Sequence, residues 1–240
     1  MSVKVVSINI EADKHLGRVG KFLAKELADL VCLMEVRQKD VLEIAGDHYP
    51  FVVFAPSDIL VSGEITGVAI LSKYPIFETE KYHCGENISR YTKLSREMGT
   101  HAPTLLMVKI MKDEMEYQMG AIHFSWTPDG HENQRQIDHL NKLLKYLEKK
   151  DEFVLCGDFN IPRGYPLYYL MKEHYLDNIP SEIATTIDPK LHRANWEIGG
   201  KLKLVVDYVW STKSYEVKKV KIESGVSDHC GVVCEVERLI

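Results

Sequence analysis

Acids, amides and histidines follow short apolar runs at several points of the 240-residue chain. The clearest case is Phe153–Asn160 (FVLCGDFN), because a run this short that ends in a turn signal is typical of a buried strand. Asp158 and Asn160 would then lie just past the carboxyl end of the strand, where ligand sites of α/β sheets gather. Gly-Asp followed by Asn is equally ordinary turn chemistry, so this stretch alone leaves both interpretations open.

Two strand ends near the start of the chain carry an amide and an acid. One apolar run ends at Asn9, and a second, Leu30–Met34, is followed at once by Glu35. The apolar residues between the runs recur at three- and four-residue steps, which predicts a helix with one buried face. A strand-helix-strand unit makes its strands parallel, so we expect Asn9 and Glu35 at the same sheet edge. An ion pair with Arg37 or Lys39, or a bound metal ion, would explain an acid there.

The second half of the chain adds two histidines and two acids. His123 closes a predicted strand, and Asp207 is the single acid of the apolar run Leu202–Ser211. A lone acid within such a run should have a hydrogen-bonding partner. Asp228 and His229 lie in a predicted turn before the last strand. A histidine at a strand end is more often structural than catalytic, but here each histidine falls beside other polar strand ends.

The spacing of apolar residues in the rest of the chain predicts the other helices and strands. It predicts helices over Glu132–Lys150 and Pro166–His174 and strands over Gly67–Ser72, Thr104–Met111, Glu116–His123, Tyr215–Glu223 and Cys230–Val236. The polar segment Tyr82–His101 is predicted to be a loop that reaches the substrate. Arg90, Trp126 and Trp196 lie in predicted loops and are candidates to clamp or stack on a substrate, with ordinary packing as the alternative for each.

The composition excludes several classes of protein. A net charge of -5 argues against a surface coated in positive charge, and 45% hydrophobic residues suffice for a single domain over residues 1–240. Neither a signal-peptide pattern nor an apolar run of membrane-spanning length is present, and the odd number of cysteines, 5, indicates reduced thiols. We therefore expect a cytoplasmic protein without a membrane span. The lysine-rich segment after residue 200 either faces phosphates or forms the solvated side of a strand.

Two other cofactor sites find little support in the sequence. Cys230 and Cys234 lie near His229, but in a strand both thiols point to the same side as Val232 and Val236, which favours a place in the core. No Cys-x-x-Cys pair completes a zinc site. The glycines form no phosphate-binding loop either.

The order of the polar motifs along the chain resembles the endonuclease/exonuclease/phosphatase superfamily, which includes deoxyribonuclease I, AP endonucleases, neutral sphingomyelinases and inositol polyphosphate 5-phosphatases. The motifs that carry the resemblance are Ser7-Ile8-Asn9-Ile10, Leu33-Met34-Glu35-Val36, Ala121-Ile122-His123-Phe124, Gly157-Asp158-Phe159-Asn160, Val206-Asp207-Tyr208 and Ser227-Asp228-His229. None is specific alone, but all six occur in the family's order. The resemblance implies a four-layer α/β sandwich, in which two mixed β-sheets pack face to face with helices outside.

The resemblance also implies a metal site. Glu35 is similar to the principal metal carboxylate of the family, and Asn9 and Asp228 match the residues that complete the metal side, directly or through water. Carboxylate and amide oxygens select a hard cation, so Mg²⁺ or Mn²⁺ is the expected cofactor. Such an ion neutralises a phosphate and the charge that develops on a leaving oxygen.

Five further residues match the catalytic positions of the family. Asp158 and Asn160 resemble the pair that positions the attacking water and the phosphate. His229 resembles the catalytic histidine, and Asp207 resembles the carboxylate that orients it. His123 matches the second histidine of the deoxyribonuclease I-like branch, where AP endonucleases usually have an amide. Either His229 or Asp158 would serve as the base, and the sequence leaves that choice open.

The expected function is therefore the hydrolysis of phosphoesters with a metal-assisted water. A phosphodiesterase or nuclease that acts on DNA or RNA is the first expectation. A phosphatase or sphingomyelinase-type phospholipase that acts on small or lipid phosphates is the alternative, and a catalytically silent binding module is a third. The natural substrate and the oligomeric state stay open.

Overall fold

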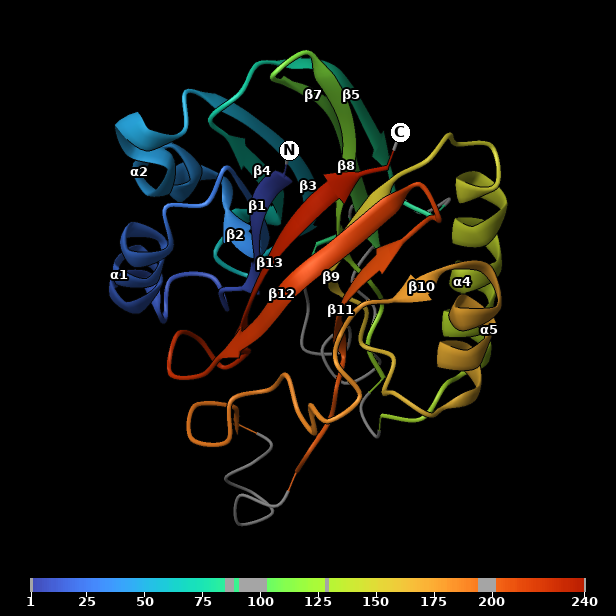
Figure 1. Cartoon of the computed structure of the whole chain (residues 1–240). Helices are drawn as coiled ribbons and strands as arrows, with labels where there is room; N and C mark the ends of the chain where they lie inside the picture. The colour runs from blue at the N-terminus through green and yellow to red at the C-terminus, as the bar shows by residue number, and fades with distance from the viewer. Residues whose placement is uncertain (1, 85–88, 91–102, 128–129, 194–201, 240) are drawn as a thin grey trace.

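The computed structural model describes residues 2–84, 89–90, 103–127, 130–193 and 202–239. These residues form two mixed β-sheets that pack against each other, with helices on both outer sides (Figure 1). The predicted four-layer α/β sandwich is thus confirmed. The described part of the chain contains no helix with the length and apolar composition needed to cross a membrane.

The larger sheet contains the strand ends predicted at Asn9 and Glu35. Its order is β12-β13-β1-β2-β4-β3-β6, and β1–β2 and β3–β6 are its parallel pairs. The strands are β1 (Ser2–Asn9), β2 (Leu30–Arg37), β3 (Phe51–Ile59), β4 (Ile65–Ser72), β6 (Ser89–Arg90), β12 (Tyr215–Glu223) and β13 (Gly231–Arg238). Because α1 (Leu16–Glu26) connects β1 to β2, the predicted strand-helix-strand unit is confirmed.

The smaller sheet contains the strand ends predicted at His123 and Asp158. Its order is β10-β11-β9-β8-β7-β5, in which β8 and β9 run parallel and the other neighbours run antiparallel. The strands are β5 (Ile76–Tyr82), β7 (Thr104–Lys112), β8 (Met115–His123), β9 (Val154–Asp158), β10 (Leu176–Asp177) and β11 (Asp207–Ser211).

Four α-helices of the described residues form the outer layers. Helices α1 and α2 (Val41–Ala45) lie beside the larger sheet, and α4 (Gln134–Leu147) and α5 (Pro166–His174) lie beside the smaller one (Figure 1). The side chain of Asn133 caps α4 by accepting a hydrogen bond of 2.9 Å from the backbone nitrogen of Gln136. The two helices predicted in the second half of the chain are therefore present, the first with shorter ends.

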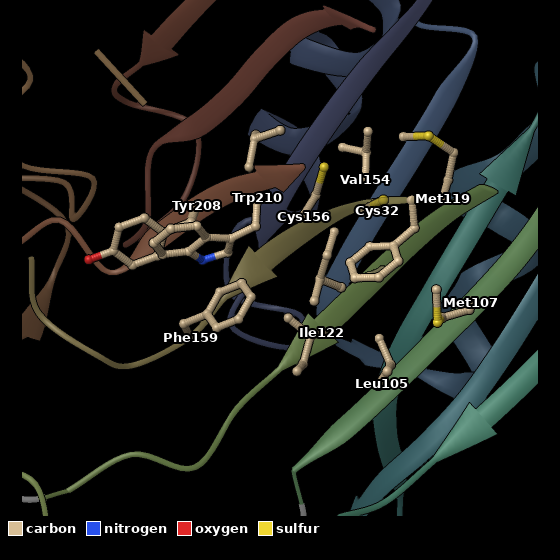
Figure 2. Close-up of a cluster of buried hydrophobic side chains, with 14 of the residues drawn as sticks. Cys32, Leu105, Met107, Met119, Ile122, Val154, Cys156, Phe159, Tyr208 and Trp210 are labelled. Carbon is tan, nitrogen blue, oxygen red and sulfur yellow. The ribbon is translucent and has the colours of Figure 1, made fainter. Parts of the chain in front are cut away.

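Strict alternation along β1 and β2 divides the core into two layers. Val5 and Cys32 face the smaller sheet, whereas Val6 and Leu33 pack beneath Phe22 of α1. Figure 2 shows the thiols of Cys32 in β2 and Cys156 in β9, together with methionine and aromatic side chains of the smaller sheet. All five cysteines are buried, and none forms a disulfide.

The structure corrects several predicted boundaries. Strands β3 and β5 were not predicted, because Pro56 interrupts β3 beside a bulge and because β5 is a mostly polar edge strand. Segment Tyr82–His101 contains the short strand β6 where a loop was predicted. The apolar run Leu202–Ser211 forms a strand only from Asp207 onwards, since the backbone before it bonds to loops.

Candidate active site

The two sheets bring seven polar residues to one edge of the sandwich. Parallel strands β1 and β2 end there, as do the parallel strands β8 and β9. Strands β11 and β13 run antiparallel to β9 and β1, so their starting residues reach the same edge. The residues that meet are Asn9, Glu35, His123, Asp158, Asp207, Asp228 and His229.

A bulge in β2 turns Glu35 towards the site. The pairing of β2 with β4 shifts register between Leu33 and Val36, and Glu35 has a φ of 55°. The bulge adds one residue to the strand, so that Leu33 and Val36 both pack under the outer helices while Glu35 points to the edge. A positive φ at a residue other than glycine costs about 1–3 kcal/mol and tends to be retained at functional positions.

Asn9 connects the acids of the two sheets. Its Nδ2 donates hydrogen bonds of 3.1 Å to Oε1 of Glu35 and 3.1 Å to Oδ2 of Asp158. Its Oδ1 accepts a hydrogen bond from the backbone nitrogen of Glu11. In this orientation Asn9 holds two carboxylates in place, and its oxygen retains one lone pair for a further contact.

A close approach of backbones fixes the end of β9. Gly157 has a φ of 142°, and a Cβ there would lie 2.0 Å from the backbone oxygen of Ile122. Asp158 follows, fully buried, and its Oδ1 accepts a hydrogen bond of 2.9 Å from the backbone nitrogen of Asn160. Phe159 lies between them in an aromatic cluster with Trp210 (Figure 2). The backbone contact at Gly157, the hydrogen bond of Asp158 and the packing of Phe159 thus fix the predicted glycine-acid-amide turn.

Asn160 and His123 lie on the β8 side of the site. Nδ2 of Asn160 donates a 3.0 Å hydrogen bond to the backbone oxygen of Phe124, one residue after His123. Nε2 of His123 lies 3.5 Å from Oε1 of Glu35 and 3.8 Å from Oδ2 of Asp158. This histidine therefore flanks both carboxylates that Asn9 connects.

His229 and Asp207 form a buried pair. Nδ1 of His229 lies 2.9 Å from Oδ2 of Asp207, and Nε2 lies 3.7 Å from Oδ2 of Asp158. The Oγ1 atom of Thr186 accepts hydrogen bonds from the backbone nitrogens of Val206 and Asp207, which fixes the start of β11. A carboxylate on Nδ1 holds the imidazole in one orientation and leaves Nε2 for chemistry.

Burial and repulsion shift the pKa values of the acids upwards. Burial, followed by the charge of Asp228, raises the pKa of Glu35 to about 7, while 38% of its side chain stays accessible to an incoming ion. Burial also raises the pKa of Asp158 to about 7, with His229 opposing the shift and Asp207 adding to it. Burial disfavours the charged form of His229, but Asp207 and Asp158 outweigh it, and its pKa rises well above the ordinary value.

The donor set of this edge fits a hard divalent cation. Within the described ranges, neither lysine nor arginine forms an ion pair with Glu35, Asp158 or Asp228. Arg37 contacts Asp13 and Asp40, and Lys39 contacts Glu64, so the ion pair considered for Glu35 is not formed. Clustered carboxylates with raised pKa values and no lysine or arginine partner are what a bound cation would stabilise.

Asp228 takes part in two groups of side chains that could hold a metal ion. One group contains Glu11 and His15, and the other contains His192 and His229, with the donor atoms of each group within 4.8 Å of one another. Glu11, His15 and His192 were not predicted from the sequence. They lie in loops without periodicity, and only the contacts of the folded chain bring them to Asp228.

The predicted substrate contacts stay predictions. Trp126 follows β8 by three residues and is half-buried. The backbone of Arg90 belongs to β6, which β4 and β3 separate from β2, and its side chain lies outside the described residues. Trp196 also lies outside them.

The lysine-rich strand β12 is a solvated edge. Lys218 forms ion pairs with Glu216 and Glu237, and Lys219 pairs with Glu235. Glu237 lies opposite Ser2, the first residue of β1, whereas the site lies at the other end of that strand. The interpretation as a phosphate-facing strip is therefore not supported for these two lysines.

Known proteins share both sequence features and architecture with this chain. The model of the Endonuclease/Exonuclease/phosphatase family matches residues 6–229, while a search of curated proteins finds no match. An endonuclease/exonuclease/phosphatase from Bacteroides vulgatus is 16% identical with a TM-score of 0.74, and 99% of each chain is covered. Sphingomyelinase C from Streptomyces griseocarneus is 15% identical with a TM-score of 0.67, covering 98% of this chain and 99% of the other. The human Nocturnin catalytic domain is 14% identical with a TM-score of 0.69, covering 99% and 93%.

Proposed function

Because the chain belongs to the Endonuclease/Exonuclease/phosphatase family, we propose that it is a divalent-metal-dependent phosphoester hydrolase that acts on phosphodiesters. Family membership supports a phosphoesterase-type hydrolase. The observation that carries the finer proposal is the hydrogen bonding of Asn9 to both Glu35 and Asp158, with Nε2 of His229 3.7 Å from Asp158. This arrangement places acids for a cation beside a histidine that can move a proton.

Glu35 and Asp228 are the proposed ligands of Mg²⁺ or Mn²⁺, and Asn9 holds Glu35 in position. Oxygen donors of this kind favour hard cations over softer metals. Such a cation would supply charge neutralisation at the phosphate and at the leaving oxygen. The repulsion between Asp228 and Glu35, which contributes to the raised pKa of Glu35, is the feature of this chain that supports the assignment.

His229 is the proposed proton-transfer group. Asp207 accepts a hydrogen bond from Nδ1, so Nε2 is directed to Asp158 and to the space beside it. From there Nε2 can accept a proton from water or, when charged, donate to a phosphoryl oxygen. Help of this type contributes about 10²–10⁴-fold in rate. Asp158 stays the rival base, since its pKa of about 7 also suits proton transfer at neutral pH.

Asn160 and His123 are proposed to orient the phosphate from the β8 side. Nδ2 of Asn160 donates one of its two hydrogens to the backbone oxygen of Phe124, which fixes the amide and leaves its second N–H for a phosphoryl oxygen. Nε2 of His123 lies 3.5 Å from Oε1 of Glu35 and 3.8 Å from Oδ2 of Asp158, which places this histidine beside the two acids at the centre of the proposed site. These contacts support a site that holds an anion, and a silent binding module would have no need of the paired acids.

A sphingomyelinase-type activity is the second candidate. The similarity to sphingomyelinase C extends over 98% of this chain at nearly equal length, and sphingomyelin and nucleic acids both contain phosphodiesters. Release of phosphocholine from sphingomyelin vesicles, nicking of plasmid DNA, and release of inorganic phosphate from monoesters separate the phospholipase, nuclease and phosphatase alternatives.

The hydrolysis of bis-p-nitrophenyl phosphate tests the common chemistry. We expect activity that requires Mg²⁺ or Mn²⁺, disappears with a chelator, and is lost in Glu35→Ala and His229→Ala. Glu173→Ala, which changes an exposed acid on α5, is the matched control and should retain activity. Activity that survives both the chelator and the Glu35→Ala, His229→Ala double substitution would refute the proposal.

A further inference from the structure

A third histidine, His192, lies at the site without a role in the mechanism above. One ring nitrogen of His192, one of His229 and a carboxylate oxygen of Asp228 lie within 4.8 Å of one another. The rings of His192 and His229 meet edge to face, with centroids 5.8 Å apart and planes at 69°. His192 is therefore on the Asp228 side of His229, whereas His123 flanks Glu35 and Asp158.

The loop that carries His192 is fixed to the loop that carries Asp228. Oδ1 of the buried Asp188 accepts hydrogen bonds from the backbone nitrogens of Lys190 and Leu191, and Oδ2 accepts one from Gly225. The backbone nitrogen of Asp188 donates a 2.7 Å hydrogen bond to the backbone oxygen of Asp228, and that of His192 donates to the oxygen of Asp188. One buried carboxylate thus sets the distance between His192 and Asp228.

The same segment is also attached to the catalytic pair. Ile187 forms a β-bridge with His229, and the backbone oxygen of Thr186 accepts a 2.7 Å hydrogen bond from Cys230. Oγ1 of Thr186 meanwhile accepts from the backbone nitrogen of Asp207. His192 is therefore mounted on a segment whose position is set by both members of the His229–Asp207 pair.

The two ring nitrogens of His192 have different surroundings. Nδ1 is buried and has no hydrogen-bond partner among the described residues. A buried donor without an acceptor costs more than an acceptor with an unused lone pair, so the neutral ring carries its proton on Nε2. The half-buried side chain then carries an N–H donor on Nε2, and Asp228 forms no hydrogen bond with it within the described structure.

We propose that His192 is a further substrate-binding residue, which donates a hydrogen bond from Nε2 to an oxygen of the phosphoryl group held beside His229. Two donors that each lie about 2.8 Å from one oxygen can be up to about 5.6 Å apart. A ring nitrogen of His192 and one of His229 lie within 4.8 Å of each other, a spacing that meets this condition. The assignment rests on the proposed phosphoester hydrolysis and adds a contact on the flank opposite His123.

Three variants distinguish this role from a structural one. His192→Ala removes the donor, and His192→Gln keeps an N–H group near the position of Nε2. His174→Ala changes an exposed histidine at the end of α5 and is the control. The measurements are KM and kcat for bis-p-nitrophenyl phosphate, the Kd of inorganic phosphate by calorimetry with Mn²⁺ present, the Kd of Mn²⁺ alone, and the thermal unfolding of each variant.

We expect His192→Ala to raise KM and the Kd of inorganic phosphate by about 10- to 100-fold, the loss of one hydrogen bond to a charged group. His192→Gln should recover most of this loss, and the affinity for Mn²⁺ should match that of the wild type in all three variants. The phosphate measurement needs no turnover, so it tests His192 even if the wild type hydrolyses none of the esters tried.

Three results would overturn the assignment. An unchanged Kd of inorganic phosphate in a folded His192→Ala variant would show that no such contact forms. A parallel loss of Mn²⁺ affinity would make His192 a metal ligand. A displaced pH profile with KM unchanged would show that it acts only by positioning His229.

Discussion

Nδ2 of Asn9 donates a 3.1 Å hydrogen bond to Oδ2 of Asp158, and this contact joins the two β-sheets at the candidate active site. The same nitrogen also binds Glu35. One amide therefore spaces two carboxylates that would otherwise repel each other. The site depends on the packing of the two sheets, because Asn9 and Asp158 are 149 residues apart in the chain.

Asn9→Ala should destabilise the protein by about 1–3 kcal/mol, because two acids lose the same buried donor. It should also lower activity, because Glu35 loses the group that positions it. Asn141→Ala, on the exposed side of α4, is the control and should change stability by no more than about 0.5 kcal/mol. Urea unfolding of both variants measures this, and equal stability of the two would contradict the role of Asn9.

Asp207→Asn should lower kcat by about 10²–10⁴-fold, because the amide no longer holds the orientation and charged form of His229. His229→Ala should cost a similar factor. Since the two residues act as a unit, the double variant should lose little beyond His229→Ala alone. Steady-state kinetics of the four proteins form the test, and losses that multiply would mean that the residues act independently.

The metal-free protein should lose stability as the pH rises through neutrality. Glu35 and Asp158 have folded pKa values of about 7, above their ordinary values of 4.5 and 3.8, so the unfolded chain releases these protons first. The free energy of unfolding must therefore fall as the pH rises from the ordinary pKa values of these acids to about 7. His229 contributes a change in the same direction. Because its pKa is raised in the fold, it stabilises the protein fully at a pH below the ordinary histidine pKa, and this stabilisation is lost as the pH rises through the folded pKa.

Urea unfolding at about pH 5 and about pH 8 measures this slope. At the higher pH, where Mn²⁺ does not compete with protons for the acids, Mn²⁺ at about 100 times its Kd should raise the free energy of unfolding by about 2.7 kcal/mol. Glu35→Gln should flatten the dependence and reduce the response to Mn²⁺. A metal-free protein that grows more stable over this range would contradict the arrangement of the acids.

Gly157→Ala should destabilise the fold by at least about 2 kcal/mol, because a Cβ would lie 2.0 Å from the backbone oxygen of Ile122. The displaced turn should also lower activity through Asp158. Gly20→Ala in α1, where nothing lies within 4 Å, should instead stabilise by about 0.5–1 kcal/mol. Thermal unfolding of the two variants compares a required glycine with a replaceable one.

The sequence predicted the elements whose pattern is local. Asn9, His123 and Asp158 end apolar runs, so their strands followed from periodicity, and the parallel direction of β1 and β2 followed from the helix between them. Edge strand β5 was missed because it packs little apolar surface, so its residues show no alternation. The apolar run Leu202–Ser211 did not show that β11 begins at Asp207, because the apolar residues before it bond to loops.

The candidate site was predictable only where it coincides with strand ends. Glu35 was predicted at the right position for a different reason, since β2 continues through a bulge to Arg37 where the sequence suggested an end. His192 and Asp188 belong to an irregular segment held by side-chain-to-backbone bonds. Such bonds leave no periodic pattern, so only the folded chain could bring His192 to His229.

The dependence of hydrolysis on added metal in the wild type and in Glu35→Gln decides whether Glu35 holds a cation that hydrolysis requires. Mn²⁺ titrated into chelator-treated protein should restore hydrolysis of bis-p-nitrophenyl phosphate along a saturable curve. Glu35→Gln should remain folded, need a much higher Mn²⁺ concentration and turn over more slowly. Wild-type hydrolysis that proceeds without metal, or a Glu35→Gln curve that coincides with the wild type, would contradict the account.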